Sequence, residues 1–143
     1  MAREGQVIEG QGGFRLHIVT LDDELLEMEA HYAGDGSLPP EHLHPKQAEH
    51  FEVLSGRMRT IIDGSERMYE AGESFDVPAG VPHTMKGEGP TRVNWQVRPS
   101  LRTADFFERV YAMGGQDAQS PEDLAKFLEE FSDEFRPTGK RYE

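Results

Sequence analysis

The sequence contains no cysteine and no apolar run long enough to cross a membrane. The absence of cysteine excludes disulfide bonds and metal sites built on thiolates. The first ten residues, MAREGQVIEG, also lack the apolar stretch of a signal peptide. We therefore expect a cytoplasmic protein that is not embedded in a membrane.

Positive charge is scarce, with 15 Lys and Arg against 27 Asp and Glu and a formal net charge of −12. Nucleic acids and anionic membrane surfaces are bound by clustered basic residues, so we expect neither as a partner. The negative charge favours solubility. A chain of 143 residues can bury one core of its own, and we predict a single domain over residues 1–143.

Residues from about 6 to 100 show the pattern of short strands separated by turns. Leu26, Met28, Ala30 and Tyr32 alternate with polar residues, which predicts a strand with one buried face. Asp63-Gly64 is a strong hairpin signal between two further strands. The predicted strands cover residues 14–19, 26–32, 51–54, 57–62, 68–70, 74–77 and 92–98. The pattern is typical of an all-β fold, either a barrel or a sandwich.

Residues from about 103 to 135 change to helical spacing, and we predict two short C-terminal helices there. Phe106, Phe107, Val110 and Tyr111 form the apolar stripe of the first. The second begins at residues 120–123, where a serine N-cap precedes a first-turn proline and a capping-box acid. We expect both stripes to serve as core packing on the barrel or as a dimer contact. The alternative is a lid over the barrel mouth.

A group of histidines and one glutamate has the composition of a metal site. His42 and His44 are two residues apart, so a strand would place both imidazoles on one face. Glu49 is out of phase with them on one continuous strand, but residues 45–47 contain a proline that can restore the phase. His83 follows two strands later and can return to the same interior. Imidazole and carboxylate together suit a divalent transition metal.

Two segments resemble the two sequence motifs of the cupin superfamily. Residues 36–56 match the first motif, and its defining residues are Gly36, His42, His44, Glu49 and Gly56. Residues 72–83 match the second, and its defining residues are Gly72, Pro78, Gly80 and His83. The family pattern has Asn at position 87, where this chain has Gly87.

This resemblance implies an antiparallel β-barrel of the jelly-roll type, to which the helical tail is an addition. It also implies that His42, His44, Glu49 and His83 hold one divalent metal, which in the family is Fe, Mn, Ni, Cu or Zn.

The other histidines, His17, His31 and His50, are expected to face solvent. Glu41 and Gln47 flank the ligands, and we weigh two roles for them: hydrogen bonding to an imidazole N–H, or a surface position.

The predicted barrel interior is apolar and aromatic. Its candidate lining residues are Phe51, Val53, Met58, Thr60, Ile62, Phe75, Val77 and Trp95. Arg57 and Arg59 are expected to face outward, whereas a phosphosugar site needs basic residues aimed inward. We therefore favour an apolar or aromatic small molecule as the ligand or substrate.

These observations favour a metal-dependent enzyme of the dioxygenase type, with Glu49 as a metal ligand and candidate catalytic proton acceptor. The alternatives are a metal-dependent isomerase, cyclase or decarboxylase, and a non-catalytic ligand-binding barrel. The chain lacks a helix-turn-helix pattern, which makes a transcription regulator a poor fit. We expect a homodimer in which the stretch from Gln6 to Val19 pairs across a two-fold axis.

Overall fold

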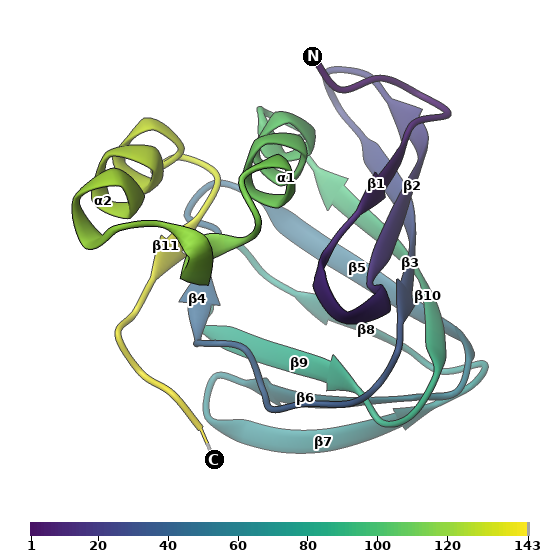
Figure 1. Cartoon of the computed structure of the whole chain (residues 1–143). Helices are drawn as coiled ribbons and strands as arrows, with labels where there is room; N and C mark the ends of the chain where they lie inside the picture. Colours follow the sequence, from purple (N-terminus) through teal and green to yellow (C-terminus); the bar gives the residue numbers. More distant parts are fainter. Residues whose placement is uncertain (143) are drawn as a thin grey trace.

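The computed structural model describes residues 1–142 and consists mainly of two antiparallel β-sheets that face each other (Figure 1). The first has the order β1-β2-β3-β10-β5-β8, and the second has the order β11-β4-β9-β6-β7. The strands of the first sheet are β1 (Val7–Glu9), β2 (Arg15–Leu21), β3 (Leu26–Tyr32), β10 (Thr91–Arg98), β5 (Ala48–Ser55) and β8 (Ser74–Val77). Those of the second are β11 (Arg136–Pro137), β4 (His42–Leu43), β9 (His83–Gly87), β6 (Arg57–Ile62) and β7 (Ser65–Glu70). This arrangement confirms the predicted all-β jelly roll.

Side-chain alternation explains why these segments form strands around a common core. In β3, Leu26, Met28 and Ala30 are fully buried, and the residues between them are partly exposed. The predicted hairpin is also present, because Asp63 and Gly64 both adopt positive φ and join β6 to β7. The core therefore lies between the two sheets.

Gly87, at the end of β9, stands in a tightly packed place where the resemblance implies Asn. It is buried, and a Cβ atom at this position would lie 3.0 Å from Cβ of Tyr32 and 3.1 Å from Cβ of Thr91. A larger residue would therefore push these two side chains apart.

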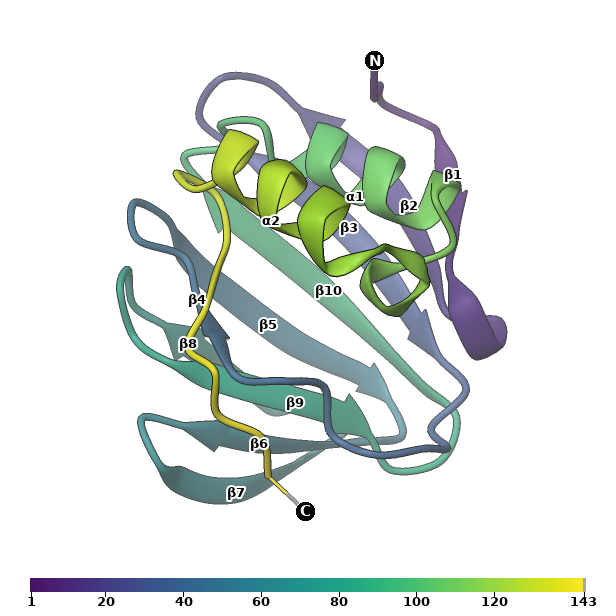
Figure 2. The ribbon, with the colours of Figure 1, turned by 60° about the vertical axis from the view of Figure 1, so that its left-hand side comes forward.

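The two predicted helices are α1 (Thr103–Ala112) and α2 (Pro121–Glu130), and they lie together at one side of the sheets (Figure 2). Short 3₁₀ turns, η1 (Gln11–Gly13) and η2 (Gln116–Ala118), complete the elements. The predicted cap of α2 is confirmed, since the Ser120 hydroxyl accepts a hydrogen bond from the Asp123 N–H at 3.1 Å. None of the helices in the described part of the chain is long and apolar enough to cross a membrane.

The apolar stripes of both helices meet at Phe106. Its ring centroid lies 5.3 Å from that of Phe127, 5.5 Å from that of Phe131 and 4.9 Å from that of Phe135. Phe107 contacts the barrel through Trp95, with the ring centroids 5.3 Å apart. The expectation of core packing is confirmed.

Two expectations about the chain ends need correction. Only part of the stretch from Gln6 to Val19 is free to pair across a two-fold axis: it divides into β1 and β2, which pair with each other, and of these two strands β1 is at the sheet edge. The helical tail also ends earlier than predicted, at Glu130, and the chain then forms β11 beside β4. The homodimer stays a prediction.

Candidate metal centre

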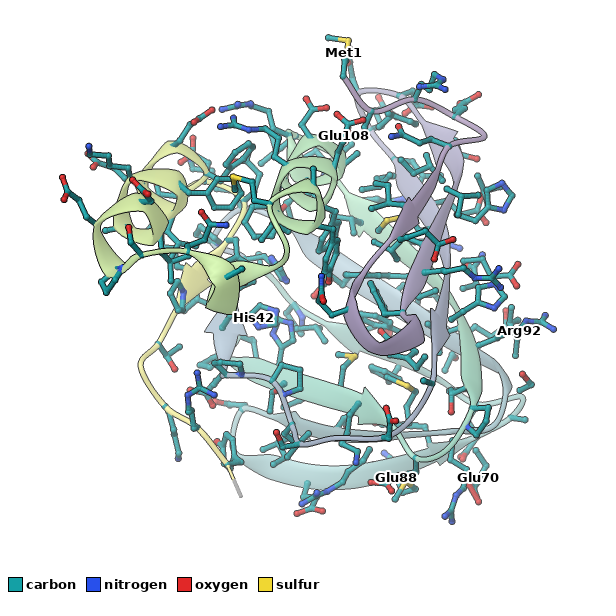
Figure 3. All side chains as sticks on the ribbon, in the orientation of Figure 1. Met1, His42, Glu70, Glu88, Arg92 and Glu108 are labelled. Atoms are coloured by element: carbon teal, nitrogen blue, oxygen red, sulfur yellow. The ribbon has the colours of Figure 1, made fainter. Side chains whose placement is uncertain are left out.

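The four residues predicted as ligands come from three strands and one turn, and the structure brings them together. His42 lies in β4 and is paired directly with His83, the first residue of β9. His44 follows in the turn between β4 and β5. This turn ends the short strand, so Glu49 enters the interior in phase with Phe51 of β5. Figure 3 shows His42 pointing into the space between β9 and the helices.

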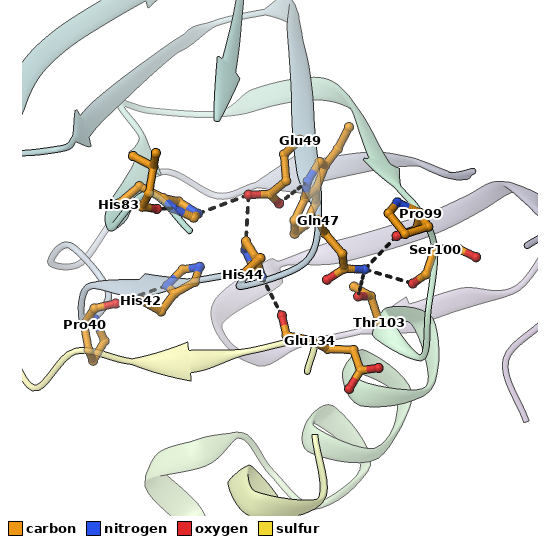
Figure 4. A network of polar contacts seen from close by, with 12 residues as sticks. Pro40, His42, His44, Gln47, Glu49, His83, Pro99, Ser100, Thr103 and Glu134 are labelled. Atoms are coloured by element: carbon orange, nitrogen blue, oxygen red, sulfur yellow. Dashed lines mark hydrogen bonds and ion pairs between the residues drawn. The ribbon is translucent and has the colours of Figure 1, made fainter. Parts of the chain in front are cut away.

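The atoms that could bind a cation lie close to one another (Figure 4). One ring nitrogen from each of His42, His44 and His83 belongs to a group whose members all lie within 4.8 Å of one another. Glu49 Oε1 lies 3.1 Å from His44 Nε2 and 3.1 Å from His83 Nε2. Three nitrogens and one oxygen therefore surround a single small volume.

The backbone fixes the tautomer of each histidine. The Nδ1–H of His44 donates to the Glu134 carbonyl at 2.7 Å, and that of His83 donates to the Val81 carbonyl at 2.9 Å. His42 Nδ1 faces the Pro40 carbonyl at 3.4 Å. A carbonyl oxygen can only accept, so each neutral ring carries its proton on Nδ1 and leaves the Nε2 lone pair free.

Two of the inward-facing atoms lack a partner within the described residues. His44 Nε2 and Glu49 Oε1 are both buried and form no hydrogen bond, although they are only 3.1 Å apart. Leaving such atoms unsatisfied costs free energy, and a cation between them would remove that cost. The residues present therefore fit a divalent metal.

Burial and local charge shift the pKa values of these side chains in different directions: His42 and Glu49 move toward the forms that bind a metal, whereas His44 moves toward the protonated form, whose proton a bound cation would displace. Burial, followed by the charges of His83 and His44, lowers the pKa of His42 to about 3, so this ring is neutral at physiological pH. Burial opposes ionisation of Glu49, but the charge of the neighbouring rings, first of His44 and then of His83, holds the pKa of its carboxyl below the usual range. Burial likewise opposes protonation of His44, and the Glu49 carboxylate outweighs it and raises the pKa of the ring.

Trp95, in β10, controls the orientation of the Glu49 carboxylate. Its indole N–H donates to Glu49 Oε2 at 2.7 Å in a buried position. With Oε2 held in this way, only Oε1 faces the histidines. Trp95 lies in the interior, as its position in the strand predicts, but the contact with Glu49 is not evident from the sequence. One sequence feature does indicate such a contact: the alternation in this strand points Trp95 inward, and a buried indole N–H needs a hydrogen-bond acceptor.

We expect Trp95→Phe to reduce the free energy of unfolding by about 1–3 kcal/mol, because it leaves Oε2 of a buried carboxylate without its donor. Urea denaturation would measure the loss. The same substitution should cost less in a Glu49→Gln background, where the charge is already absent. Equal costs in the two backgrounds would contradict the assigned contact.

The structure contradicts both roles considered for Glu41 and Gln47, and neither side chain bonds to an imidazole. The Gln47 amide donates to the carbonyls of Pro99 and Ser100 and to the Thr103 hydroxyl, tying the ligand turn to the start of α1. Glu41 accepts from the C-terminal segment. Both are buried, so a surface position is wrong as well.

The remaining histidines lie away from the centre, as predicted. His17 is exposed, whereas His31 and His50 are partly exposed beside the carboxylates of Glu29 and Asp76.

The C-terminal segment also reaches the centre, a contact that no sequence pattern predicts. Besides the Glu134 carbonyl, it supplies Phe135, whose ring stacks on His42 at a centroid distance of 4.6 Å and an interplanar angle of 21°.

The four side chains border a cavity of about 770 Å³, which both helices help to enclose. The position of the two helices beside the cavity supports the lid alternative as well as core packing. The aromatic lining residues of the cavity are Phe14, Tyr32, Phe51, Trp95, Phe106, Phe107, Tyr111 and Phe135. Of the predicted lining residues, Phe51 and Trp95 border the cavity. The other six do not: Val53, Met58, Phe75 and Val77 belong to the apolar core, Thr60 is buried beside it, and Ile62 is partly buried against it. Asp35, Lys86 and Arg141 also border the cavity, so the wall carries more charge than predicted.

Comparison with known proteins gives one family match and several structural matches. The family model of the cupin domain matches residues 18–97. Quercetin 2,3-dioxygenase of Bacillus subtilis (strain 168) is 30% identical over 63 residues, which cover 44% of this chain and 19% of that enzyme. The chain thus spans about a fifth of the length of this relative.

The structural matches have low sequence identity and show the fold alone. KdgF from Halomonas sp. has a TM-score of 0.60 and 19% identity, covering 66% of this chain and 86% of that one. An RmlC-like cupin from Shewanella frigidimarina has a TM-score of 0.61 and 19% identity, covering 72% of this chain and 91% of that one.

Proposed function

Because this chain belongs to the cupin family, we propose that it is a metal-dependent small-molecule enzyme of the dioxygenase type. Its substrate would be an apolar or aromatic compound. The observation that carries the proposal is the convergence of His42, His44, His83 and Glu49 on the wall of a largely aromatic cavity. The partial match to a dioxygenase supports the reaction class.

The proposed ligands are the Nε2 atoms of the three histidines and Oε1 of Glu49. They would hold one divalent ion of Fe, Mn, Ni, Cu or Zn, and four protein ligands leave room for further ligands on a five- or six-coordinate ion. Such an ion supplies Lewis acidity and, where it is redox-active, reactivity toward dioxygen.

Glu49 is the proposed catalytic residue. Its carboxylate is ionised, Oε2 is held by the Trp95 indole, and Oε1 faces the cavity side of the histidines. When Oε1 is not acting as a metal ligand, it would accept a proton from a bound substrate, while Trp95 keeps the carboxylate in one orientation.

The cavity favours a flat aromatic compound with polar oxygen substituents. Phe51, Phe106 and Phe107 offer aromatic surfaces, and Tyr32 and Tyr111 add phenolic groups. Burial raises the pKa of Tyr32 above its usual value and that of Tyr111 to about 12. Both phenols therefore stay protonated at physiological pH and can donate hydrogen bonds to a ligand oxygen.

The basic side chains of the barrel are poorly placed for a phosphate site, and Arg141, which borders the cavity, is exposed to solvent. Arg59 lies outside and pairs with Glu66, and Arg57 is exposed as predicted. Lys86, which borders the cavity, already donates to the Gly36 carbonyl at 3.0 Å. These contacts favour the aromatic substrate class over phosphorylated sugars.

Oxygen uptake tests the reaction class. We expect the protein loaded with Fe²⁺ under anaerobic conditions to consume dioxygen when it is mixed with a flat hydroxylated aromatic compound, with quercetin as the first probe. The metal-free protein is the control. The Glu49→Gln variant should bind the probe but consume much less dioxygen, because its side chain cannot accept the proton.

Two other outcomes would replace the proposal with one of its alternatives. Turnover that proceeds equally well without oxygen would indicate a metal-dependent isomerase, cyclase or decarboxylase. Binding of the probe without turnover of any member of a broad aromatic panel would indicate a non-catalytic ligand-binding barrel.

A further inference from the structure

The chain after α2 turns back across the open side of the jelly roll and runs beside β4 (Figure 2). We call residues 134–142 the C-terminal strap. Within it, Arg136 and Pro137 of β11 pair with Leu43 and His42 of β4. The cupin family match ends at residue 97, so the strap lies outside the matched part of the barrel.

The strap contacts two of the proposed ligands directly. The Glu134 carbonyl accepts the Nδ1–H of His44 at 2.7 Å, which directs the Nε2 lone pair of that ring to the centre. Phe135 stacks on His42 at 4.6 Å and limits the rotation of its ring. The Nδ1 atom of His42 makes a long contact, 3.4 Å from the Pro40 carbonyl, so the stacked Phe135 ring adds a second restraint on the orientation of His42.

The strap is itself anchored on Glu41, the residue before His42. The Thr138 N–H donates to the Glu41 carbonyl at 3.1 Å, and the Glu41 N–H donates to the Lys140 carbonyl at 2.9 Å. The two oxygens of the Glu41 carboxylate accept from the Thr138 hydroxyl at 2.7 Å and the Tyr142 hydroxyl at 2.9 Å. Glu41 is buried, so these hydrogen bonds are shielded from water, and they fix the position of the residue that precedes β4 and His42.

From these contacts we propose that the C-terminal strap is a positioning part of the metal centre, which sets its affinity and coordination geometry through His42 and His44. This rests on the proposed metal site. Glu134 and Phe135 act on the rings, and Thr138 and Tyr142 hold the backbone that carries His42. A barrel without the strap would present the same ligands with less defined orientations.

Cobalt(II) binding tests this role, because its visible absorption reports ligand geometry as well as occupancy. We expect Phe135→Ala to weaken Co²⁺ binding about 10-fold and to alter the spectrum, since loss of an outer partner of a metal-ligating histidine has effects of this size. Phe135→Tyr should restore both, because it keeps the stacked ring. The double variant Thr138→Val/Tyr142→Phe leaves Phe135 in place and should also weaken binding.

Asp133→Asn is the matched control, because Asp133 lies just before the strap and forms only an exposed ion pair with Lys46. Its affinity and spectrum should equal those of the unchanged protein. Wild-type affinity and spectrum in both Phe135→Ala and the double variant would overturn the role of the strap and leave the metal site standing. Failure of the unchanged protein to bind Co²⁺ would instead overturn the metal site and this inference together.

Discussion

Replacing both His42 and His44 with alanine is expected to lower the metal content of the purified protein from about one ion per chain to almost none. The substitution removes two of the three ring nitrogens that lie within 4.8 Å of one another. His83 and Glu49 would remain, and two ligands cannot compete with the hydration of a divalent ion as four can. Elemental analysis by mass spectrometry of protein purified without added metal measures the loss and identifies the metal.

The matched control is the double variant His17→Ala/His50→Ala. It also removes two imidazoles, but from positions away from the centre: His17 is exposed and His50 pairs with Asp76 on the outside. Its metal content should equal that of the unchanged protein, and thermal unfolding would confirm that both double variants are folded. Stoichiometric metal in the His42→Ala/His44→Ala protein would contradict the ligand assignment. Iron in the unchanged protein would strengthen the dioxygenase proposal, whereas zinc, which has no redox chemistry, would weaken it.

Phe106→Ala is expected to reduce the free energy of unfolding by about 3–5 kcal/mol, the usual range for deleting a buried phenylalanine ring. Phe106 in α1 is only 2% exposed. Its ring packs against Phe127 of α2 and against Phe135, the residue that stacks on His42. This is a large part of the stability of a typical domain, about 5–15 kcal/mol. Urea denaturation measures the change, with the slope of the transition checked for two-state behaviour.

Phe106→Leu is the control, because it keeps most of the apolar volume and should cost clearly less. A loss below about 1 kcal/mol for Phe106→Ala would show that the helices are stabilised elsewhere. The alanine variant should also bind metal more weakly, because Phe135 loses the ring that packs behind it at 4.9 Å.

The sequence predicts the barrel, His42, His44 and Glu49 from local features, whereas the resemblance of residues 72–83 to the second cupin motif adds His83. Hairpin turns and alternating residues define the strands, and the turn after His44 explains how Glu49 regains the inward phase. Each of these signals lies within a few residues of the feature that it predicts.

The contacts around the ligands could not be predicted in the same way. Glu41 and Gln47 are neighbours of the ligands in sequence, but their partners are Thr138 and Thr103, which are 97 and 56 residues away. Strand β11 contains two residues, Arg136 and Pro137, and so has no alternation to detect. Its position depends on how the helices pack, which a single sequence does not specify.

The indole that donates to Glu49 is the single tryptophan of the sequence. Ultraviolet emission excited in the indole band therefore originates from one place, next to the carboxylate that would receive a cation. The protein carries a native optical reporter at this position, so events at the centre can be followed in real time without a dye or an engineered label.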